Sequence, residues 1–230
     1  MHIVFAVAIP IQAGCQQCEC LLQLFVLCDN HVSAVRAADK IAPILGQEVA
    51  SGMIVSVPSG LVGRWSHPLG AIPKGESVRV IHDLSYPRGF SVNDHQTYLH
   101  RSWMSADSIM QQLCQYDYIG KTDITAYYRH FAIHPVHWPL LGFNFNGKFY
   151  WDTRLNFGMR NAPEIADRVT QAMVRRATTV GGIEKLAAVV DDFTVIHPDL
   201  DICTAQWRWL NADLVDLGFT VNPVKCAPPS

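Results

Sequence analysis

Apolar side chains recur every three or four positions in four segments of the chain, and this spacing predicts four amphipathic helices. The segments are residues 31–52, 105–116, 161–180 and 200–217. Ser105 and Asn161 stand where helix-capping residues are expected, and glycines end the first, third and fourth segments. Pro43 lies within the first segment, so we expect that helix to be interrupted there.

Shorter apolar runs between turn residues predict strands. They cover residues 69–73, 78–83, 118–123, 140–145, 148–151, 186–190, 193–197 and 219–222. Turn residues at 74–77, 146–147 and 191–192 separate three pairs of these runs, and we expect a hairpin at each. The order of helices and strands after residue 100 predicts an α+β fold in which helices cover one face of an antiparallel sheet.

Residues 1–30 differ in composition from the rest of the chain. They are apolar, contain four of the seven cysteines and precede the first Lys or Arg, Arg36. Their apolar runs are shorter than the ~18 residues that a membrane span needs, so we expect no membrane association. Cys15, Cys18 and Cys20 lie close together, but structural zinc usually takes two separated pairs of ligands. We expect an irregular leader that packs weakly, and a zinc-binding or interaction module is the alternative.

The composition of the whole chain is that of a globular protein. Its 230 residues are 49% hydrophobic and 17% charged, and 18 basic against 20 acidic residues give a net charge of −2. This balance excludes a strongly basic protein that wraps nucleic acid, but it permits binding through one local patch. The later cysteines are scattered singly, which indicates a reducing, intracellular location.

Three aspartates at predicted strand ends are the clearest sign of chemistry. Asp191 and Asp192 are either an ordinary turn or two acids presented at the tip of a buried hairpin. Asp123 ends another apolar run, and the ends of such strands can be neighbours in a compact sheet. Asp123 and Asp191 would then form a carboxylate pair that needs a cation, and oxygen ligands suit Mg²⁺. Two such ions can hold the attacking and leaving oxygens of a phosphoryl transfer.

Six short segments of the chain carry a family resemblance. In chain order they are PLGAIPK at 68–74, RVIHDLSYP at 79–87, DITAYYRHFAIHP at 123–135, LNFGMRNAP at 155–163, VVDD at 189–192 and LGFTVNPVKC at 217–226. Together they resemble, in order and spacing, the fingers and palm of the reverse transcriptases of retrotransposons. The segment SVND at 91–94 is most similar to the DIRS-type retroelements.

The resemblance implies an architecture and an activity. Residues 31–104 would be fingers-like and residues 105–230 palm-like, and the chain would end before the primer grip and thumb, so we expect the thumb to be absent. The implied activity is RNA-directed DNA synthesis, in which a primer 3′-hydroxyl attacks the α-phosphate of a nucleotide. The implied partners are an RNA or DNA template with its primer, and deoxynucleoside triphosphates.

The same resemblance assigns roles to the acids and to one lysine. Asp123 and Asp191 would hold two Mg²⁺ or Mn²⁺ ions, with the backbone carbonyl of Ile124 as a further ligand. Asp192 would be the second acid of its motif, near the primer end. Lys225 would protonate the leaving pyrophosphate, and the alternative for Lys225 is a solvated loop lysine.

Five further residues would bind the incoming nucleotide. Tyr128 falls where the family keeps an aromatic residue under the sugar, which would exclude a 2′-hydroxyl, and the alternative is a core aromatic. Lys74 and Arg79 would contact the triphosphate, although taken alone they are ordinary hairpin charges. Phe157 and Gly158 would shape the nucleotide pocket.

The sequence departs from the family pattern at four positions. Ala126 stands where a second acid is usual, and Tyr127 follows where Ala is usual. Val189 replaces a Tyr and Asn156 replaces a Pro. Ala126, the unmatched leader and the absent thumb favour a second function for the chain, a truncated, non-catalytic remnant of the same fold that at most binds nucleic acid. The acids that remain in place disfavour it.

Overall fold

The computed structural model describes residues 6–7, 26–58, 65–97, 99 and 117–230, and their contacts divide them into two compact units. The N-terminal unit contains the described residues up to 99 together with residues 131–162. The C-terminal unit contains residues 117–130 together with residues 163–230. Residues 131–162 thus pack with the N-terminal unit, although they lie in the region expected to be palm-like. The functional boundaries at residues 30 and 104 stay a prediction.

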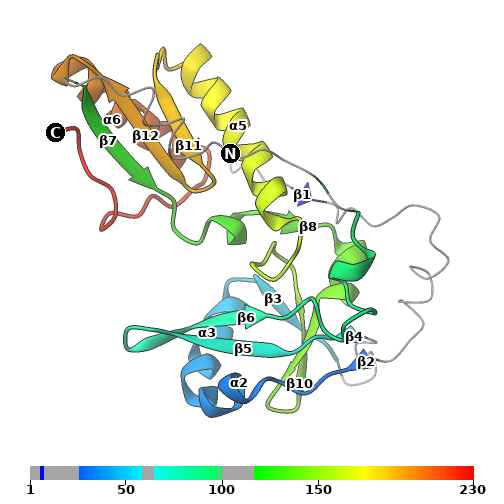
Figure 1. The fold of residues 1–230 in the computed structure, drawn as a ribbon. Coiled ribbons are helices and arrows are strands. Elements are labelled where there is room, and N and C mark those ends of the chain that lie inside the picture. The colour runs from blue at the N-terminus through cyan, green and yellow to red at the C-terminus, as the bar shows by residue number, and fades with distance from the viewer. Residues whose placement is uncertain (1–5, 8–25, 59–64, 98, 100–116) are drawn as a thin grey trace. The chain divides into compact units, whose positions relative to one another are not determined.

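A three-stranded antiparallel sheet forms the centre of the C-terminal unit (Figure 1). Its strands are β7 (Tyr118–Asp123), β11 (Leu186–Val189) and β12 (Asp192–His197), in the order β11-β12-β7. β7 begins and ends where the sequence predicts, and β11 and β12 form the predicted hairpin. Val195 and Ile196 of the central strand are both fully buried. Because consecutive side chains point to opposite faces of a strand, both faces of β12 are covered.

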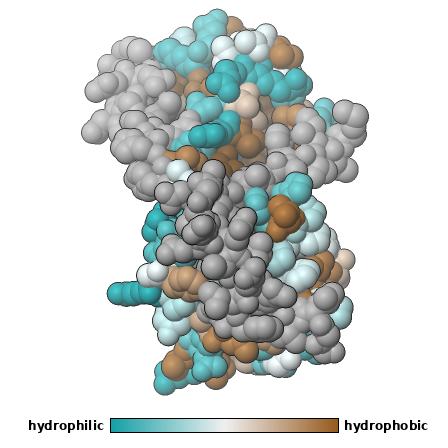
Figure 2. Space-filling view, turned by 90° about the vertical axis from the view of Figure 1, so that its right-hand side faces the viewer, coloured by the Kyte–Doolittle hydropathy of each residue, from teal (hydrophilic) through white to brown (hydrophobic). Residues whose placement is uncertain are grey.

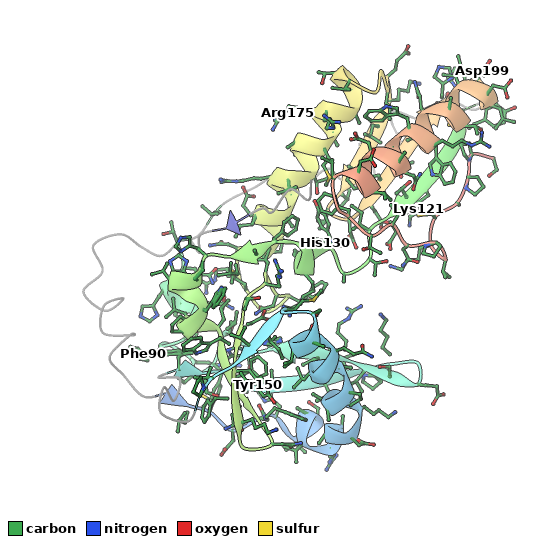
Figure 3. The ribbon with its side chains drawn as sticks, turned by 180° about the vertical axis from the view of Figure 1, so that it is seen from behind. Phe90, Lys121, His130, Tyr150, Arg175 and Asp199 are labelled. Carbon is green, nitrogen blue, oxygen red and sulfur yellow. The ribbon has the colours of Figure 1, made fainter. Side chains whose placement is uncertain are left out.

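Two helices belong to the same unit. They are α5 (Ala162–Thr179) and α6 (Leu200–Asp216), close to the predicted segments. α6 lies on β7, where the indole N–H of Trp207 donates to the carbonyl of Lys121 at 3.1 Å. Arg176 of α5 and Asp213 of α6 form an ion pair of 2.7 Å, and Figure 3 shows the two helices side by side. The predicted arrangement of helices beside an antiparallel sheet is confirmed.

The N-terminal unit combines short helices with small sheets. Its helices are α2 (Val32–Arg36) and α3 (Ala38–Ala50). One sheet has the order β3-β10-β9, with β3 (Ile54–Ser56), β9 (Gly142–Phe145) and β10 (Lys148–Asp152). The predicted hairpin consists of β5 (Leu69–Lys74) and β6 (Ser77–His82). Two parallel pairs join β1 (Ala6–Val7) to β8 (Ala132–Ile133) and β2 (Val26–Leu27) to β4 (Trp65–Ser66).

An apolar cluster connects both helices of the N-terminal unit to several of its strands. Its buried members are Ala34, Ile41, Leu45, Ile54, Leu69, Phe143 and Phe145. They come from both helices and from three strands. Of the periodic apolar positions of residues 31–52, Ile41 and Leu45 face this cluster, whereas Val35 and Val49 are exposed. Short 3₁₀ helices complete the described chain: η2 (Asn93–His95), η3 (Tyr127–His130) and η4 (Pro135–Leu141).

Three expectations about element boundaries are wrong, two of them in the N-terminal unit. The helix expected to be interrupted at Pro43 continues through it and is instead divided at Ala37. Ile41 and Leu45 on either side of Pro43 are both buried, and this packing keeps the helix continuous. Residues 140–141 belong to η4 and not to the following strand, because Pro139 precedes them and cannot donate to a strand ladder.

The strand expected over residues 219–222 is reduced to one bridge, between Ile124 and Val221. The amide oxygen of Asn222 accepts from the backbone N–H groups of Val224 and Lys225, at 3.1 and 3.3 Å. This turn interrupts the ladder, and the chain pairs with β7 again only at the bridge between Lys121 and Ala227.

Some expectations fall on residues that the structure does not describe. The predicted helix 105–116 and the cysteines at 15, 18 and 20 lie outside the described residues. Cys28 is described and is a half-buried free thiol. Among the described residues, no helix is long and apolar enough to cross a membrane. Figure 2 shows hydrophilic residues and smaller hydrophobic groups interspersed over the described part of one face.

A buried polar chain links three strands of the N-terminal unit. Nε2 of His67, which follows β4, lies 2.9 Å from Nδ1 of His82 on β6. Nε2 of His82 lies 3.8 Å from Oδ2 of Asp152 on β10. His67 is completely buried, and burial holds its pKa well below the ordinary value of 6.5. His67 therefore stays neutral in the folded protein at pH values where an unfolded chain would bind a proton.

We predict that stability falls as the pH is lowered below about 6.5, because the unfolded state then binds a proton that buried His67 excludes. His67→Gln should reduce this dependence, since Gln does not titrate. Gln47→Ala, which changes an exposed residue of the same unit that does not titrate, should leave it unaltered. Urea unfolding midpoints between pH 5 and 8 measure the effect. Equal pH dependence in wild type and His67→Gln would contradict it.

Candidate functional site

Three acidic residues gather at one end of the sheet of the C-terminal unit. Asp123 is the last residue of β7, and Asp192, the first residue of β12, is its direct partner in the antiparallel register. Val189 pairs with Asp192, so Val190 and Asp191 form the turn between β11 and β12. The backbone N–H of Ile124 donates to the carbonyl of Asp191 at 3.1 Å. The structure therefore brings together the acids that the sequence places at separate strand ends.

The negatively charged carboxylates of this cluster repel one another. The pKa of Asp191 is raised, chiefly because its carboxyl is half-buried and further because Asp192 and Asp123 are negatively charged. Lysines offset part of the repulsion. Nζ of Lys225 lies 2.9 Å from Oδ2 of Asp123, and Nζ of Lys121 lies 3.1 Å from Oδ1 of Asp192. The hydrogen bond to Asp123 raises the pKa of Lys225, which therefore carries its proton at neutral pH.

One buried carboxylate oxygen of the cluster has the environment of a cation ligand. Oδ1 of Asp123 is buried and has no hydrogen-bond partner within the described part of the chain. A buried carboxylate oxygen without a partner is costly, and a metal ion relieves that cost. No group of three or more His, Cys, Asp or Glu side chains in the described ranges could hold a metal ion by itself. This donor set suits Mg²⁺, which commonly takes one or two carboxylates and completes its shell with substrate phosphates and water.

Tyr128 lies close to the acids. It belongs to η3 and is 8% exposed. Burial, and secondly the charge of Asp191, raise the pKa of Tyr128 to about 12, so its hydroxyl is neutral at physiological pH. Ala126, just before η3, has φ of 50°, and this left-handed residue turns the chain sharply after β7. The turn places Tyr128 within electrostatic range of Asp191.

The four other predicted nucleotide-binding residues belong to the N-terminal unit. The guanidinium carbon of Arg79 lies 5.6 Å from the ring centre of Phe157, in a cation–π arrangement. Phe157 is 56% exposed, so a face of the ring remains available to solvent. Arg79 is paired with Ile72 across the β5-β6 hairpin, and Lys74 lies two residues further along β5. Lys74 and Arg79 therefore share one face of the hairpin.

Gly158 is required by a close backbone approach. A Cβ atom at this position would lie 1.7 Å from the carbonyl oxygen of His82. The side chain of Asn93 spans this loop: its Nδ2 donates to the carbonyl of Gly158, and its Oδ1 accepts from the N–H of Arg160, both at 2.8 Å. Asn93 was not among the residues expected to belong to a site. It lies in the segment at 91–94 that carries a family resemblance, but its residue type and spacing do not mark it as a site residue.

Comparisons with known proteins bear on the fold. No family model and no curated protein sequence matches the chain. The chain is similar to the foamy viral protease-reverse transcriptase solved with double-stranded DNA, with a TM-score of 0.76 and 15% identity over 98% of this chain and 36% of that one. The prototype foamy virus protease-reverse transcriptase CSH mutant gives a TM-score of 0.75 and 18% identity, over 95% of this chain and 27% of that one. The foamy viral enzyme with an RNA/DNA hybrid gives 0.72 and 17%, over 89% and 26%.

These similarities show a reverse transcriptase-like fold for the chain. The chain spans less than half the length of each of these three proteins. A function for the chain must account for both this fold and the acid cluster.

We predict that Asp191→Asn stabilises the protein in the absence of divalent ions, because it removes one charge from a mutually repelling cluster. Tm should rise by roughly 2–4 °C for each kcal/mol of repulsion removed. The gain should shrink as the pH falls through the raised pKa of Asp191, since the wild-type carboxyl is then neutral as well. Thermal scans in EDTA test this. Glu184→Gln, an exposed loop residue of the same unit, is the control for loss of charge alone.

Proposed function

We propose that this chain is the polymerase part of an RNA-directed DNA polymerase from a retroelement of the DIRS type. The observation that carries the proposal is the acid cluster, in which Asp123, Asp191 and Asp192 meet at adjoining strand ends and one buried oxygen of Asp123 has no hydrogen-bond partner among the described residues. The reaction is attack of a primer 3′-hydroxyl on the α-phosphate of a deoxynucleoside triphosphate. Pyrophosphate is the leaving group.

Two divalent cations, Mg²⁺ or Mn²⁺, complete the proposed site. Asp123 and Asp191 would hold them, with the carbonyl of Ile124 as a further ligand, and Asp192 would be the second acid of its motif, near the primer end. Such ions neutralise developing negative charge and favour deprotonation of the attacking hydroxyl. The raised pKa of Asp191 supports this assignment, because a bound cation would remove the repulsion that Asp192 and Asp123 exert.

The residues of the chain itself would bind and orient the nucleotide. Arg79 and Lys74 provide positive charge for the triphosphate on one face of the β5-β6 hairpin, and Phe157 and Gly158 would form the pocket. Tyr128 would pack against the sugar. Asp123 raises the pKa of Lys225, so the lysine is charged at neutral pH, and it would be the proton donor to pyrophosphate.

The proposed partners are a template with its primer and deoxynucleoside triphosphates. Two of the similar foamy viral proteins were solved with double-stranded DNA and with an RNA/DNA hybrid, which supports a nucleic-acid duplex as the partner of this fold. A net charge of −2 requires that any such contact be local. The competing function is a non-catalytic protein of the same fold, and Ala126 in place of an acid favours it.

Primer extension distinguishes these two functions. The full chain should extend a DNA primer on an RNA template when Mg²⁺ or Mn²⁺ is present, and EDTA should stop the extension. Asp123→Asn should abolish extension without unfolding the protein, whereas Glu184→Gln should extend like wild type. Binding of the duplex with no extension under any of these conditions would favour the non-catalytic alternative.

Tyr128→Ala should raise incorporation of ribonucleotides relative to deoxynucleotides, because it opens space for the 2′-hydroxyl. Tyr128→Phe keeps the ring and should retain the wild-type preference. The measurement is incorporation of matched dNTP and rNTP on one primer. If the ratio is the same in all three proteins, Tyr128 is a packing residue and the pocket assignments made with it should be withdrawn.

A further inference from the structure

The turn that carries Asp191 has an unfavourable backbone conformation. Val190 has φ of 55°, in the left-handed region. A β-branched residue is a clear outlier there, because its side chain crowds the backbone. Short hairpin turns with positive φ usually use Gly, Asn or Asp at such positions. The sequence of this turn therefore does not specify its own shape, and contacts from outside the turn must hold it.

Two such contacts are present, one for each carbonyl of the turn. The hydroxyl of Thr170 on α5 donates to the carbonyl of Val190 at 2.6 Å. The N–H of Ile124, immediately after β7, donates to the carbonyl of Asp191 at 3.1 Å. The turn is thus fastened to a helix on one side and to the Asp123 strand on the other.

The Thr170 hydroxyl is itself held by a second hydroxyl. Thr170 is completely buried, and the hydroxyl of Tyr127, which is 2% exposed, lies 2.8 Å from its Oγ1. Thr170 has a single hydroxyl proton, so if it donates that proton to Val190, Tyr127 is the donor to Thr170. Burial raises the pKa of Tyr127 well above its usual value, so the phenol keeps its proton at any working pH.

The alternative partner of both hydroxyls is the carbonyl of Ala166. It lies 3.2 Å from Thr170 Oγ1 and 3.2 Å from the Tyr127 oxygen. The contact from Thr170 to Val190 is much shorter. If Tyr127 donates to Thr170 and Thr170 donates to Val190, the carbonyl of the strained Val190 also has a hydrogen-bond donor.

We infer that Tyr127 and Thr170 are positioning residues: their hydroxyls form a relay that fixes the Val190–Asp191 turn and so sets where the Asp191 carboxylate stands relative to Asp123. Tyr127 follows directly on Ala126, the other left-handed residue of the site. The relay therefore joins the two strained connections that flank the acids. This inference rests on the proposed function in one respect, the role of Asp191 as a metal ligand.

The test uses the full chain and two readouts, neither of which needs polymerase activity. Hydrogen exchange of the Ile124 amide, followed by NMR, reports whether the turn is held. Binding of Mn²⁺, followed by the loss of its free-ion electron paramagnetic resonance signal, reports whether Asp191 is placed to hold a cation. The variants are Thr170→Val, which removes the hydroxyl while keeping the side-chain shape, and Thr170→Ser, which keeps the hydroxyl. Thr178→Val makes the same change at an exposed site on α5, where the hydroxyl donates to Val174 of its own helix.

Thr170→Val should speed Ile124 exchange and weaken Mn²⁺ binding, each about tenfold, the size expected when a buried carbonyl loses its donor. Thr170→Ser and Thr178→Val should behave like wild type. Tyr127→Phe should act in the same direction as Thr170→Val with a smaller effect, and it serves as the test if Thr170→Val does not fold.

Three results would contradict the inference or the proposed function on which it rests. Unchanged Ile124 exchange in Thr170→Val and Tyr127→Phe would overturn the relay. Faster exchange with unchanged Mn²⁺ binding would overturn the positioning role and leave the proposed function intact. Equal Mn²⁺ binding by wild type and Asp191→Asn would overturn the metal-ligand role of Asp191, and with it the proposed function, whatever the exchange data show.

Discussion

The pairing of β12 with β7 is the interaction on which the candidate site depends. It places Asp192 directly opposite Asp123, and the same register runs through to His197 and Tyr118. A slip of one residue would turn every side chain of β12 to the other face of the sheet. Gly120 of β7 helps to keep this register, because only a glycine fits beneath Trp207 of α6: a Cβ atom at this position would lie 2.8 Å from the indole. The docking of α6 on β7 thus helps to decide where the acids meet.

At the Asp123–Asp192 end of the β7-β12 ladder, this register destabilises the protein. Like charges directly opposite one another in an antiparallel pair are destabilising. Lys121 and Lys225 reduce the repulsion, but both are substantially exposed, so solvent screens much of their effect. The protein also maintains left-handed backbone at Ala126 and Val190, on the two connections that carry the acids. Strain and repulsion concentrated at one place are typical of functional sites, where the surrounding structure holds an arrangement that local preference disfavours.

The sequence predicts those features that depend on local pattern. β7, the turn at residues 146–147 and the helices α5 and α6 follow from apolar spacing, capping residues and glycine stops, and all are where we expect them. The association of Asp123 with the 191–192 pair follows from their positions at strand ends. The conformation of Val190 does not follow, because no turn-forming residue type precedes Asp191. The hydrogen bonds of Thr170 and of Asn93 join residues far apart in the sequence, and spacing carries no information about them.

The N-terminal unit is assembled from two separate stretches of the chain, and this has a consequence for synthesis on the ribosome. Ile54 of β3 is buried in the finished protein, and its partner strand contributes Asp152, about 100 residues later. At ~5–20 residues per second, that partner emerges roughly 5–20 s after β3. During this interval β3 lacks the strand that pairs with it. A nascent chain of this protein therefore exposes an unpaired strand edge, which is the kind of edge that promotes aggregation.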